Sequence, residues 1–356
     1  MSGMEDRRPV LVTGGAGFIG CNLADRLAGE GHDVIVYDAL YRPGVEDNLR
    51  WLKANHGERI HPVIADIGDA ECLRDAASQA KAIFHLAAQV AVTSSLESPL
   101  QDFQTNLAST VSLLEIARAL PEPPPLIFAS TNKVYGDLAD LELRCTGEGH
   151  RPADPAQRGG VSESRPLDFH TPYGCSKGAA DQYVLDYARS FGLPAAVMRM
   201  SCIYGERQMG TEDQGWVAHF LIRAIEGQPI TLYGDGHQVR DILHVSDAVD
   251  AYLSLWRRID SVSGVPFNLG GGPDNAVSLR QLLDHIEQVT GRVVDLRLAD
   301  WRAGDQRYFV ADTARARDAL GFSAKVGWRD GVGRLAAWLM SERAPDVEML
   351  AVAGSR

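Results

Sequence analysis

Long apolar runs are missing from this sequence. No stretch reaches the about 18 apolar residues that mark a membrane span, and the first eight residues, MSGMEDRR, lack the apolar core of a signal peptide. Cysteine is also scarce: the five Cys residues form no C-x-x-C pair and their number is odd, so reduced thiols are the simplest account. We therefore expect a cytoplasmic protein without a membrane partner.

A surplus of basic residues is absent as well. The chain has 35 Lys and Arg against 47 Asp and Glu, a net charge of −12, which argues against nucleic acid as a partner. An anionic small ligand is still allowed, because a few local arginines can outweigh the overall field. Internal repeats are lacking too, and 356 residues with 45% hydrophobic content indicate a globular chain of about two domains or one two-lobed unit.

Apolar, β-branched runs alternate with helical patterns in the first part of the chain. They predict strands at 10–13, 33–38, 60–66, 82–86, 126–130 and 195–199, and helices near 18–27, 69–79, 98–119 and 173–191. Near-continuous apolar strands separated by helices indicate a parallel sheet covered on both faces. The predicted fold class is therefore α/β, with a doubly wound sheet of the Rossmann type and a smaller C-terminal substrate lobe.

The pattern divides the chain into three parts: a dinucleotide-binding domain over 9–200, a smaller lobe over 201–341 and a tail over 342–356. Within the first part, the polar segment 137–170 is predicted to be a long surface loop, of the kind that often forms a lid or binding loop. In the lobe, loops are expected over 200–240 and helices near 246–258, 277–290 and 313–320. The tail has no clear periodicity, and we expect it to be disordered.

A glycine-rich turn follows the first predicted strand. In TGGAGFIG (13–20), Gly15, Gly17 and Gly20 satisfy G-x-G-x-x-G between a strand and a helix. The chemistry needs a tight turn, close backbone approach to a pyrophosphate, and helix N–H groups that face the anion. The predicted dinucleotide contacts from this turn are Gly14, Gly17, Phe18, Ile19 and Gly20.

Asp38 ends the second predicted strand, eighteen positions past Gly20. A carboxylate there binds the ribose hydroxyls and repels a 2′-phosphate, which favours NAD, although nearby Arg42 leaves NADP open. Further cofactor contacts are expected where the third and fourth strands end, from Asp66, Ile67, Leu86, Ala87 and Ala88. Asp66 could instead cap the next helix.

Tyr173 and Lys177 lie four apart at the start of a helical pattern, which puts both side chains on one helix face. An ammonium beside a phenol should lower the phenol's pKa and make a usable general base, although an exposed helix pair is the alternative. Lys177 can also bind the nicotinamide ribose. The strand that ends at Ser130 and Thr131 would bring one hydroxyl to the cofactor and one to the substrate.

Four stretches carry a family resemblance over nearly the whole chain, about residues 10 to 340. They are STNKVYGDL (130–138), LDFHTPYGCSKGAADQYVLDYARSFGL (167–193), DQGWV (213–217) and GDQRYFVAD (304–312). With the glycine turn, they resemble the extended short-chain dehydrogenases, which include the UDP-galactose 4-epimerases, and more closely the CDP-paratose (CDP-tyvelose) 2-epimerases. The resemblance implies NAD and inversion of C2 of a CDP-linked hexose by transient oxidation to a 2-keto sugar, rotation and hydride return. Thr131, Tyr173 and Lys177 match the family's catalytic trio.

Two details refine the expected chemistry. Asn132 and Lys133 stand where 4,6-dehydratases place an Asp-Glu pair, and Asn cannot ionise, so dehydration is disfavoured. The chain reads Met-Ser-Cys-Ile at 200–203, where the family pattern is His-Ser-Ser-Met, so paratose, glucose and another CDP-sugar all stay open. A UDP-sugar 4-epimerase or decarboxylase and a non-catalytic dinucleotide sensor are the alternatives.

The resemblance also implies substrate contacts and an assembly. Arg240 and Arg302 match the family's diphosphate-binding arginines, although either could be a surface ion pair. The other expected substrate contacts are Thr131, Asn132, Lys133, Gln208, Gln214 and Trp216, of which Trp216 could equally belong to the core. Helices 98–119 and 173–191 resemble the pair through which extended members dimerise, so we expect a homodimer or homotetramer.

Overall fold

A parallel seven-stranded sheet lies at the centre of the computed structural model, which describes residues 6–302 and 305–353, with side chains as far as residue 342. Its strand order is β12-β8-β5-β4-β1-β2-β3. The strands are β1 (Val10–Thr13), β2 (Val34–Asp38), β3 (Ile60–Ile64), β4 (Ala82–His85), β5 (Leu126–Thr131), β8 (Ala195–Met200) and β12 (Pro266–Leu269). The order reverses between β1 and β4, which opens a crevice at the carboxyl ends of the strands, where such sheets bind ligands. The predicted doubly wound fold is confirmed.

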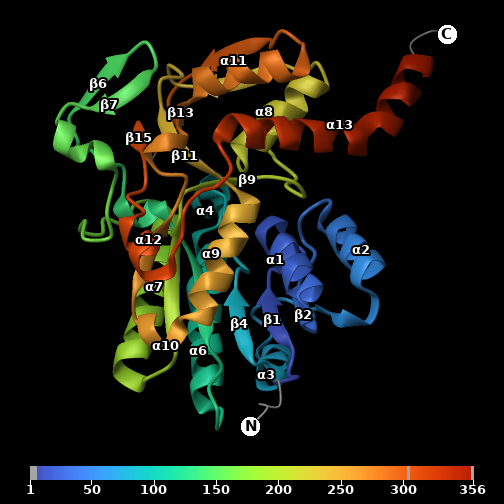
Figure 1. Cartoon of the computed structure of the whole chain (residues 1–356), viewed down its shortest axis with the longest axis vertical. Coiled ribbons are helices and arrows are strands. Elements are labelled where there is room, and N and C mark those ends of the chain that lie inside the picture. Colours follow the sequence, from blue (N-terminus) through green and yellow to red (C-terminus); the bar gives the residue numbers. More distant parts are fainter. Residues whose placement is uncertain (1–5, 303–304, 354–356) are drawn as a thin grey trace.

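Helices cover both faces of this sheet (Figure 1). One face packs against α1 (Phe18–Gly29), α2 (Val45–His56), α9 (Val245–Arg257), α10 (Ile259–Val262) and α12 (Ala314–Leu320). The other packs against α3 (Ala70–Gln79), α6 (Ser109–Ala119) and α7 (Thr171–Phe191). The predicted helix 98–119 is present but divided, because α5 (Pro99–Phe103) and α6 are joined by the π-helical turn η2 (Gln104–Ala108). The helix α4 (Val92–Glu97) precedes α5.

A smaller lobe lies beyond the carboxyl ends of the strands, at the top of Figure 1. Its apolar core joins α8 (Trp216–Ile225), α11 (Leu279–Thr290) and α13 (Trp328–Ala353). Its strands are β9 (Cys202–Tyr204), β10 (Ile230–Tyr233), β11 (Val239–His244), β13 (Ala276–Ser278), β14 (Leu296–Ala299) and β15 (Tyr308–Phe309). Short 3-10 turns complete the chain: η1 (Gly57–Arg59), η3 (Asn132–Tyr135), η4 (Pro155–Gly159) and η5 (Pro273–Asn275).

The expected division at residue 200 does not hold throughout. After β11 the chain returns to the first sheet, where α9 covers one face and β12 pairs with β8 as the seventh strand, Pro266 opposite Val197. The expected loops of 200–240 also contain β9, α8 and β10. The predicted disordered tail is helical as far as Ala353, because α13 continues into it, and 354–356 lie outside the described residues.

The segment 137–170 is more ordered than the predicted loop. It contains an antiparallel hairpin of β6 (Leu143–Thr146) and β7 (Gly149–Pro152), and its Leu138 and Val161 join an apolar cluster with Phe309. The β6 side chains are mostly exposed, so the strand has no apolar pattern that a sequence could reveal. Across the described part of the chain, no helix combines the length and apolar character needed to cross a bilayer.

Candidate active site at the carboxyl end of the sheet

A cavity of about 870 Å³ lies at the crevice between β1 and β4. It is lined by every residue predicted to contact the dinucleotide: Gly14, Gly17, Phe18, Ile19, Gly20, Asp38, Asp66, Ile67, Leu86, Ala87, Ala88, Ser130, Tyr173 and Lys177. Of the predicted substrate contacts, it is lined by Thr131, Asn132, Lys133, Gln208, Gln214 and Trp216. Residues far apart in the sequence therefore share one cavity of a size suited to a small-molecule site.

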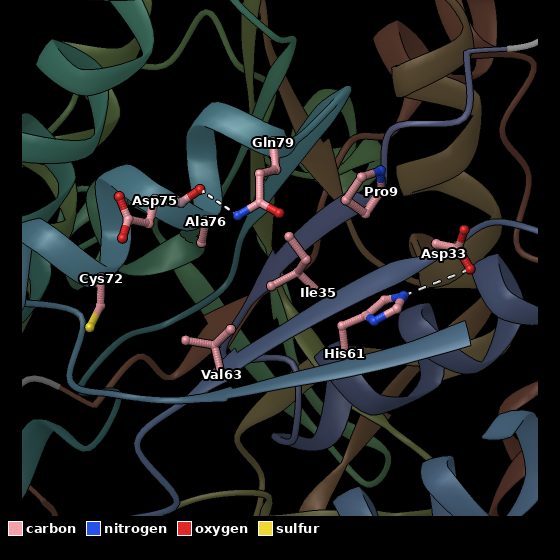
Figure 2. A pocket seen from close by; sticks show the side chains of 9 residues that line it. All are labelled: Pro9, Asp33, Ile35, His61, Val63, Cys72, Asp75, Ala76 and Gln79. Atoms are coloured by element: carbon pink, nitrogen blue, oxygen red, sulfur yellow. Dashed lines mark hydrogen bonds and ion pairs between the residues drawn. The ribbon is translucent and has the colours of Figure 1, made fainter. Parts of the chain in front are cut away.

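A second cavity, of about 430 Å³, lies between α3 and the strands β2 and β3, of which β3 is the edge of the sheet (Figure 2). Pro9 and Asp33, which line it, directly precede β1 and β2, so it opens at the amino ends of the strands. His61 and Asp33 form a loose pair at 3.8 Å on its rim. Ligands of doubly wound sheets bind at the carboxyl ends, so we do not assign the site to this cavity.

At Gly14 and Gly20 the glycine turn leaves no room for a side chain. Gly14 has a φ of +68°, and a Cβ there would lie 2.8 Å from the backbone nitrogen of Ala87. A Cβ on Gly20 would lie 2.1 Å from the carbonyl oxygen of Gly14. No described side chain caps α1 at Gly17, so the N–H groups of its first turn are open to the cavity. The turn is thus a backbone cradle that fits a pyrophosphate.

Asp38 and Asp66 follow in the chain, and their carboxylates have different hydrogen-bond partners. The Asp38 carboxylate accepts hydrogen bonds from the backbone N–H groups of Ala16 (3.0 Å) and Leu40 (2.9 Å), which fixes it at the cavity wall with lone pairs left for a ribose diol. Asp66 accepts a hydrogen bond from the Gly68 N–H at 2.7 Å. The N-cap of α3 is Asp69, so the alternative role of Asp66 as a helix cap is wrong. These residues fit the adenosine half of a dinucleotide.

Thr131, Tyr173 and Lys177 meet in the same cavity. Thr131 ends β5, while Tyr173 and Lys177 come from the first two turns of α7. A side-chain hydrogen bond joins Thr131 to Tyr173. The Lys177 ammonium nitrogen lies 4.1 Å from the ring centre of Phe128, and both Tyr173 and Lys177 are buried. The exposed-pair interpretation of Tyr173 and Lys177 is therefore wrong.

Burial dominates the acid–base properties of this pair. It raises the pKa of Tyr173 to about 12, although the hydrogen bond to Thr131 and the positive charge of Arg42 oppose it. It lowers the pKa of Lys177 to about 7, against the negative charges of Asp181 and Asp102. The expected fall of the Tyr173 pKa is therefore wrong for this structure, because removing the phenol from water outweighs its charged neighbours.

Asn132 and Lys133 lie beside Thr131 at the wall of the cavity. The Asn132 amide accepts a hydrogen bond from the Thr131 hydroxyl at 3.3 Å and donates one to the Gln306 side chain at 3.1 Å. Burial and the charge of Arg240 lower the pKa of Lys133. This part of the wall therefore offers a neutral amide and an amine.

Arg240 and Arg302, both within the described part of the chain, lie outside the cavity lining. Arg240 is buried and pairs with Asp305 at 2.7 Å. Arg302 lies 3.3 Å from a carboxylate oxygen of Glu212, and its guanidinium stacks 3.9 Å from the ring centre of Tyr233. Binding of a diphosphate by these arginines stays a prediction, and it would require exchange of these carboxylate partners.

The segment after β9 closes one side of the cavity. Arg42, which follows β2, donates a hydrogen bond to the Gln214 side chain and so links the two lobes. Gln208 donates to the carbonyl of Ile203 at 3.2 Å. The Trp216 indole N–H donates to the Cys202 thiol at 3.4 Å, and the ring packs on the core of the smaller lobe while also lining the cavity. Trp216 is therefore partly a core residue, and it also lines the cavity where a substrate contact was predicted.

Sequence reasoning missed a buried polar group on the same wall. Asp102 lines the cavity and accepts hydrogen bonds from Ser176 and Asn106. The available signal was the four-residue spacing of Asp102 and Asn106 in a helical pattern, which places two polar side chains on one helix face.

Comparisons with known proteins agree with this geometry. The model of the NAD dependent epimerase/dehydratase family matches residues 10–270. The CDP-paratose 2-epimerase of Salmonella typhi is 42% identical over 93% of this chain and 99% of its own. Among solved structures, the UDP-glucose 4-epimerase of Thermotoga maritima with UDP-glucose matches with a TM-score of 0.80 and 30% identity, covering 94% of this chain and 99% of its own. The Thermus thermophilus UDP-glucose 4-epimerase complex with NAD matches with a TM-score of 0.78 and 29% identity over 93% and 98%.

Proposed function

The chain belongs to the NAD dependent epimerase/dehydratase family, and from that premise we propose that it inverts C2 of a CDP-linked hexose. The observation that carries the choice of sugar is the 42% identity to a CDP-paratose 2-epimerase over almost the full length of both chains. The stretches 130–138 and 167–193, which supply Thr131, Tyr173 and Lys177, support the same choice. The sugar is paratose, glucose or another hexose, because the 200–203 segment differs from the family pattern.

The cofactor residues described above fit NAD. When bound, NAD supplies a ring that accepts a hydride from the sugar and returns it. The glycine turn holds the pyrophosphate and Asp38 the adenosine ribose. The cofactor carries the hydride, so the chain's own residues have two tasks: they move the proton and they orient the sugar.

Tyr173 carries the proton in this proposal. Its phenolate form takes the proton of the C2 hydroxyl and becomes a phenol, which later gives the proton back, while the hydrogen-bonded Thr131 orients the sugar oxygen. Lys177 supports the phenol from the next helical turn and holds the nicotinamide ribose. Arg240 and Arg302 hold the diphosphate, so the oxidised sugar can turn while the nucleotide stays bound.

The test is to incubate the purified protein in deuterated water with CDP-paratose, CDP-tyvelose, CDP-glucose and UDP-glucose, and to follow the sugar signals by proton NMR. We expect one CDP-sugar to be epimerised at C2 and to retain its proton there, because the hydride returns from the cofactor. Epimerisation of UDP-glucose at C4 alone would establish the UDP-sugar alternative. Deuterium at C2 would exclude transient oxidation.

Tyr173→Phe should abolish turnover while NAD still co-purifies with the protein, because the phenyl ring keeps the packing and loses only the proton carrier. Tyr187→Phe is the matched control on the same helix, since the Tyr187 hydroxyl bonds Glu115 away from the cavity. Turnover that survives in Tyr173→Phe would rule out the proposed base.

We further propose that the protein assembles as a homodimer, or a homotetramer built from such dimers, through α5 and α7. Large apolar side chains are exposed on both helices: Leu100 is 68% exposed, Phe103 48%, Tyr183 46% and Phe191 51%. Exposed apolar patches of this kind mark interaction surfaces. Phe103→Glu should give monomers in analytical ultracentrifugation, whereas Val293→Glu, at a residue 92% exposed on the smaller lobe, should not. A wild-type monomer would refute this assembly.

A cytoplasmic location is also part of the proposal. All five cysteines, each in the described part of the chain, are free, and this is the usual state of thiols in a reducing compartment. Fractionation of the producing cells with antibodies against the protein tests it, and recovery outside the cytoplasm would refute it.

A further inference from the structure

A buried carboxylate outside the proposed trio faces the catalytic helix. Asp102, on α5, is 1% exposed and lines the cavity. One of its oxygens accepts a hydrogen bond from the hydroxyl of Ser176, the residue directly before Lys177. That hydroxyl also lies 3.2 Å from the carbonyl oxygen of Tyr173. Asp102 therefore contacts the helical turn that carries both candidate catalytic side chains.

The other Asp102 oxygen is connected by hydrogen bonds to the segment 86–89, on the cofactor side of the cavity. It accepts a hydrogen bond from the Asn106 amide at 3.0 Å. Asn106 in turn donates to the carbonyl of Gln89 at 3.0 Å and accepts from its N–H at 2.9 Å, and Gln89 directly follows the cavity-lining residues 86–88. Asn106 belongs to the π-helical turn η2, and such turns occur frequently at functional sites. The network joins α5, the segment 86–89 and α7.

Two carboxylates, Asp181 and Asp102, act on Lys177, and they differ in whether a cation contacts them. Asp181 raises the Lys177 pKa more than Asp102 does, but it also forms two hydrogen bonds of 2.9 Å with the Arg199 guanidinium, a cation in direct contact. The hydrogen-bond partners of Asp102 in the described part of the chain, Ser176 and Asn106, are neutral. Burial raises the pKa of the Asp102 carboxyl, which the Ser176 hydrogen bond and the positive charge of Lys177 oppose, and the negative charge of Asp102 in turn raises the pKa of both Lys177 and Tyr173.

Resting on the proposed function, we propose that Asp102 is a positioning residue of the reaction. Through Ser176 and Asn106 it fixes the Tyr173–Lys177 turn against the cofactor segment 86–89, and its carboxylate provides the counter-charge for the Lys177 ammonium.

This role has a definite consequence for pH dependence. Lys177 faces Asp102 from α5, Asp181 from α7 and His85 from β4, whose pKa burial lowers to about 3, so that His85 stays neutral. Tyr173 faces Asp102 and Arg42. Without the Asp102 charge, the pKa values of Lys177 and Tyr173 both fall. Both limbs of the pH profile should therefore move to lower pH.

The experiment compares the NAD-loaded wild type with Asp102→Asn, which keeps the shape and removes the charge, and with Ser176→Ala, which keeps the charge and removes the contact. Asp186→Asn, an exposed carboxylate on α7, is the control. For Asp102→Asn we expect normal NAD content and melting temperature, KM within about twofold, kcat about tenfold lower, and both limbs shifted by about one pH unit. Ser176→Ala should lower kcat without moving the limbs. A uniform loss of kcat in Asp102→Asn with unmoved limbs would overturn the proposal.

A second readout does not depend on any sugar. Carbon-13 NMR of lysine-labelled protein follows the titration of Lys177, whose signal is assigned by its absence from Lys177→Met. The midpoint should fall by about one pH unit in Asp102→Asn and stay constant in Asp186→Asn. An unchanged midpoint in Asp102→Asn would refute the proposal that Asp102 is the counter-charge of the Lys177 ammonium. If no sugar is turned over, the proposed function fails while the NMR titration still decides the role of Asp102.

Discussion

Replacing Lys177 with Met should change the pH dependence of stability, so that the variant gains most relative to the wild type at neutral and acidic pH. Lys177 is 3% exposed, and burial lowers its pKa from 10.5 to about 7. In the unfolded chain the ammonium is hydrated and keeps its ordinary pKa. Because the unfolded state binds the proton more tightly, the charged lysine opposes folding fully below pH 7, and this cost disappears as pH rises from 7 to 10.5.

The size of the effect follows from the shift. Each pKa unit corresponds to about 1.4 kcal/mol, so a fall from 10.5 to about 7 costs about 5 kcal/mol as an upper limit. Lys177→Met removes this pH-dependent cost. It also removes the interactions with Asp181, Asp102 and the Phe128 ring, which adds an offset that changes little with pH. The slope of the stability difference against pH, and not its absolute value, therefore measures the buried charge.

Urea unfolding at pH values of about 6, 8 and 10 measures this slope, with preparations of equal NAD content compared. The advantage of Lys177→Met over the wild type should be largest at the lowest pH and shrink as pH rises. Lys325→Met is the control: the hydrogen bond to Asp250 raises the Lys325 pKa above 10.5, so its contribution is constant across this range. Parallel pH dependences of the wild type and Lys177→Met would refute the argument.

Two further substitutions test the fold of the site. Gly20→Ala places a Cβ 2.1 Å from the Gly14 carbonyl oxygen, so the protein should purify without NAD, as measured by nucleotide released on heating; normal NAD content would contradict the cradle. Arg199→Met leaves the Asp181 carboxylate buried without its cation and should cost about 3–5 kcal/mol in urea unfolding near neutral pH. The exposed pair of Arg118 and Glu115 is its control, and Arg118→Met should cost less than about 1 kcal/mol. Equal losses in the two variants would contradict the role given to burial.

The sequence predicted the strands of the first sheet well because of where they lie. β1, β4 and β5 are buried along their whole length, so they read as unbroken apolar runs bounded by turns. The glycine turn was recognisable because packing allows only glycine at Gly14 and Gly20. Local constraints of this kind determine the residue types, so the sequence alone reveals them.

Features that depend on distant contacts were not predictable. β12 has four residues, and only its pairing with β8 makes it part of the first sheet. The π-helical turn adds no residue type that differs from an ordinary helix, yet it aims Asn106 at Gln89. The Tyr173 pKa shift also escaped prediction, because its sign depends on burial, which the spacing of Tyr173 and Lys177 does not reveal. Each of these properties arises only when the chain is folded.

The residues beside Thr131 in the cavity wall favour epimerisation over dehydration. Elimination of water from an oxidised sugar needs one group that takes a proton and one that gives a proton to the leaving oxygen. Here the Asn132 amide cannot ionise and is engaged with Thr131 and Gln306. Burial and the charge of Arg240 lower the pKa of Lys133, but a carboxylic acid partner is not supplied at position 132. The oxidised sugar should therefore keep all its oxygens, and mass spectrometry should find product and substrate of equal mass. A product lighter by one water would overturn the assignment as an epimerase.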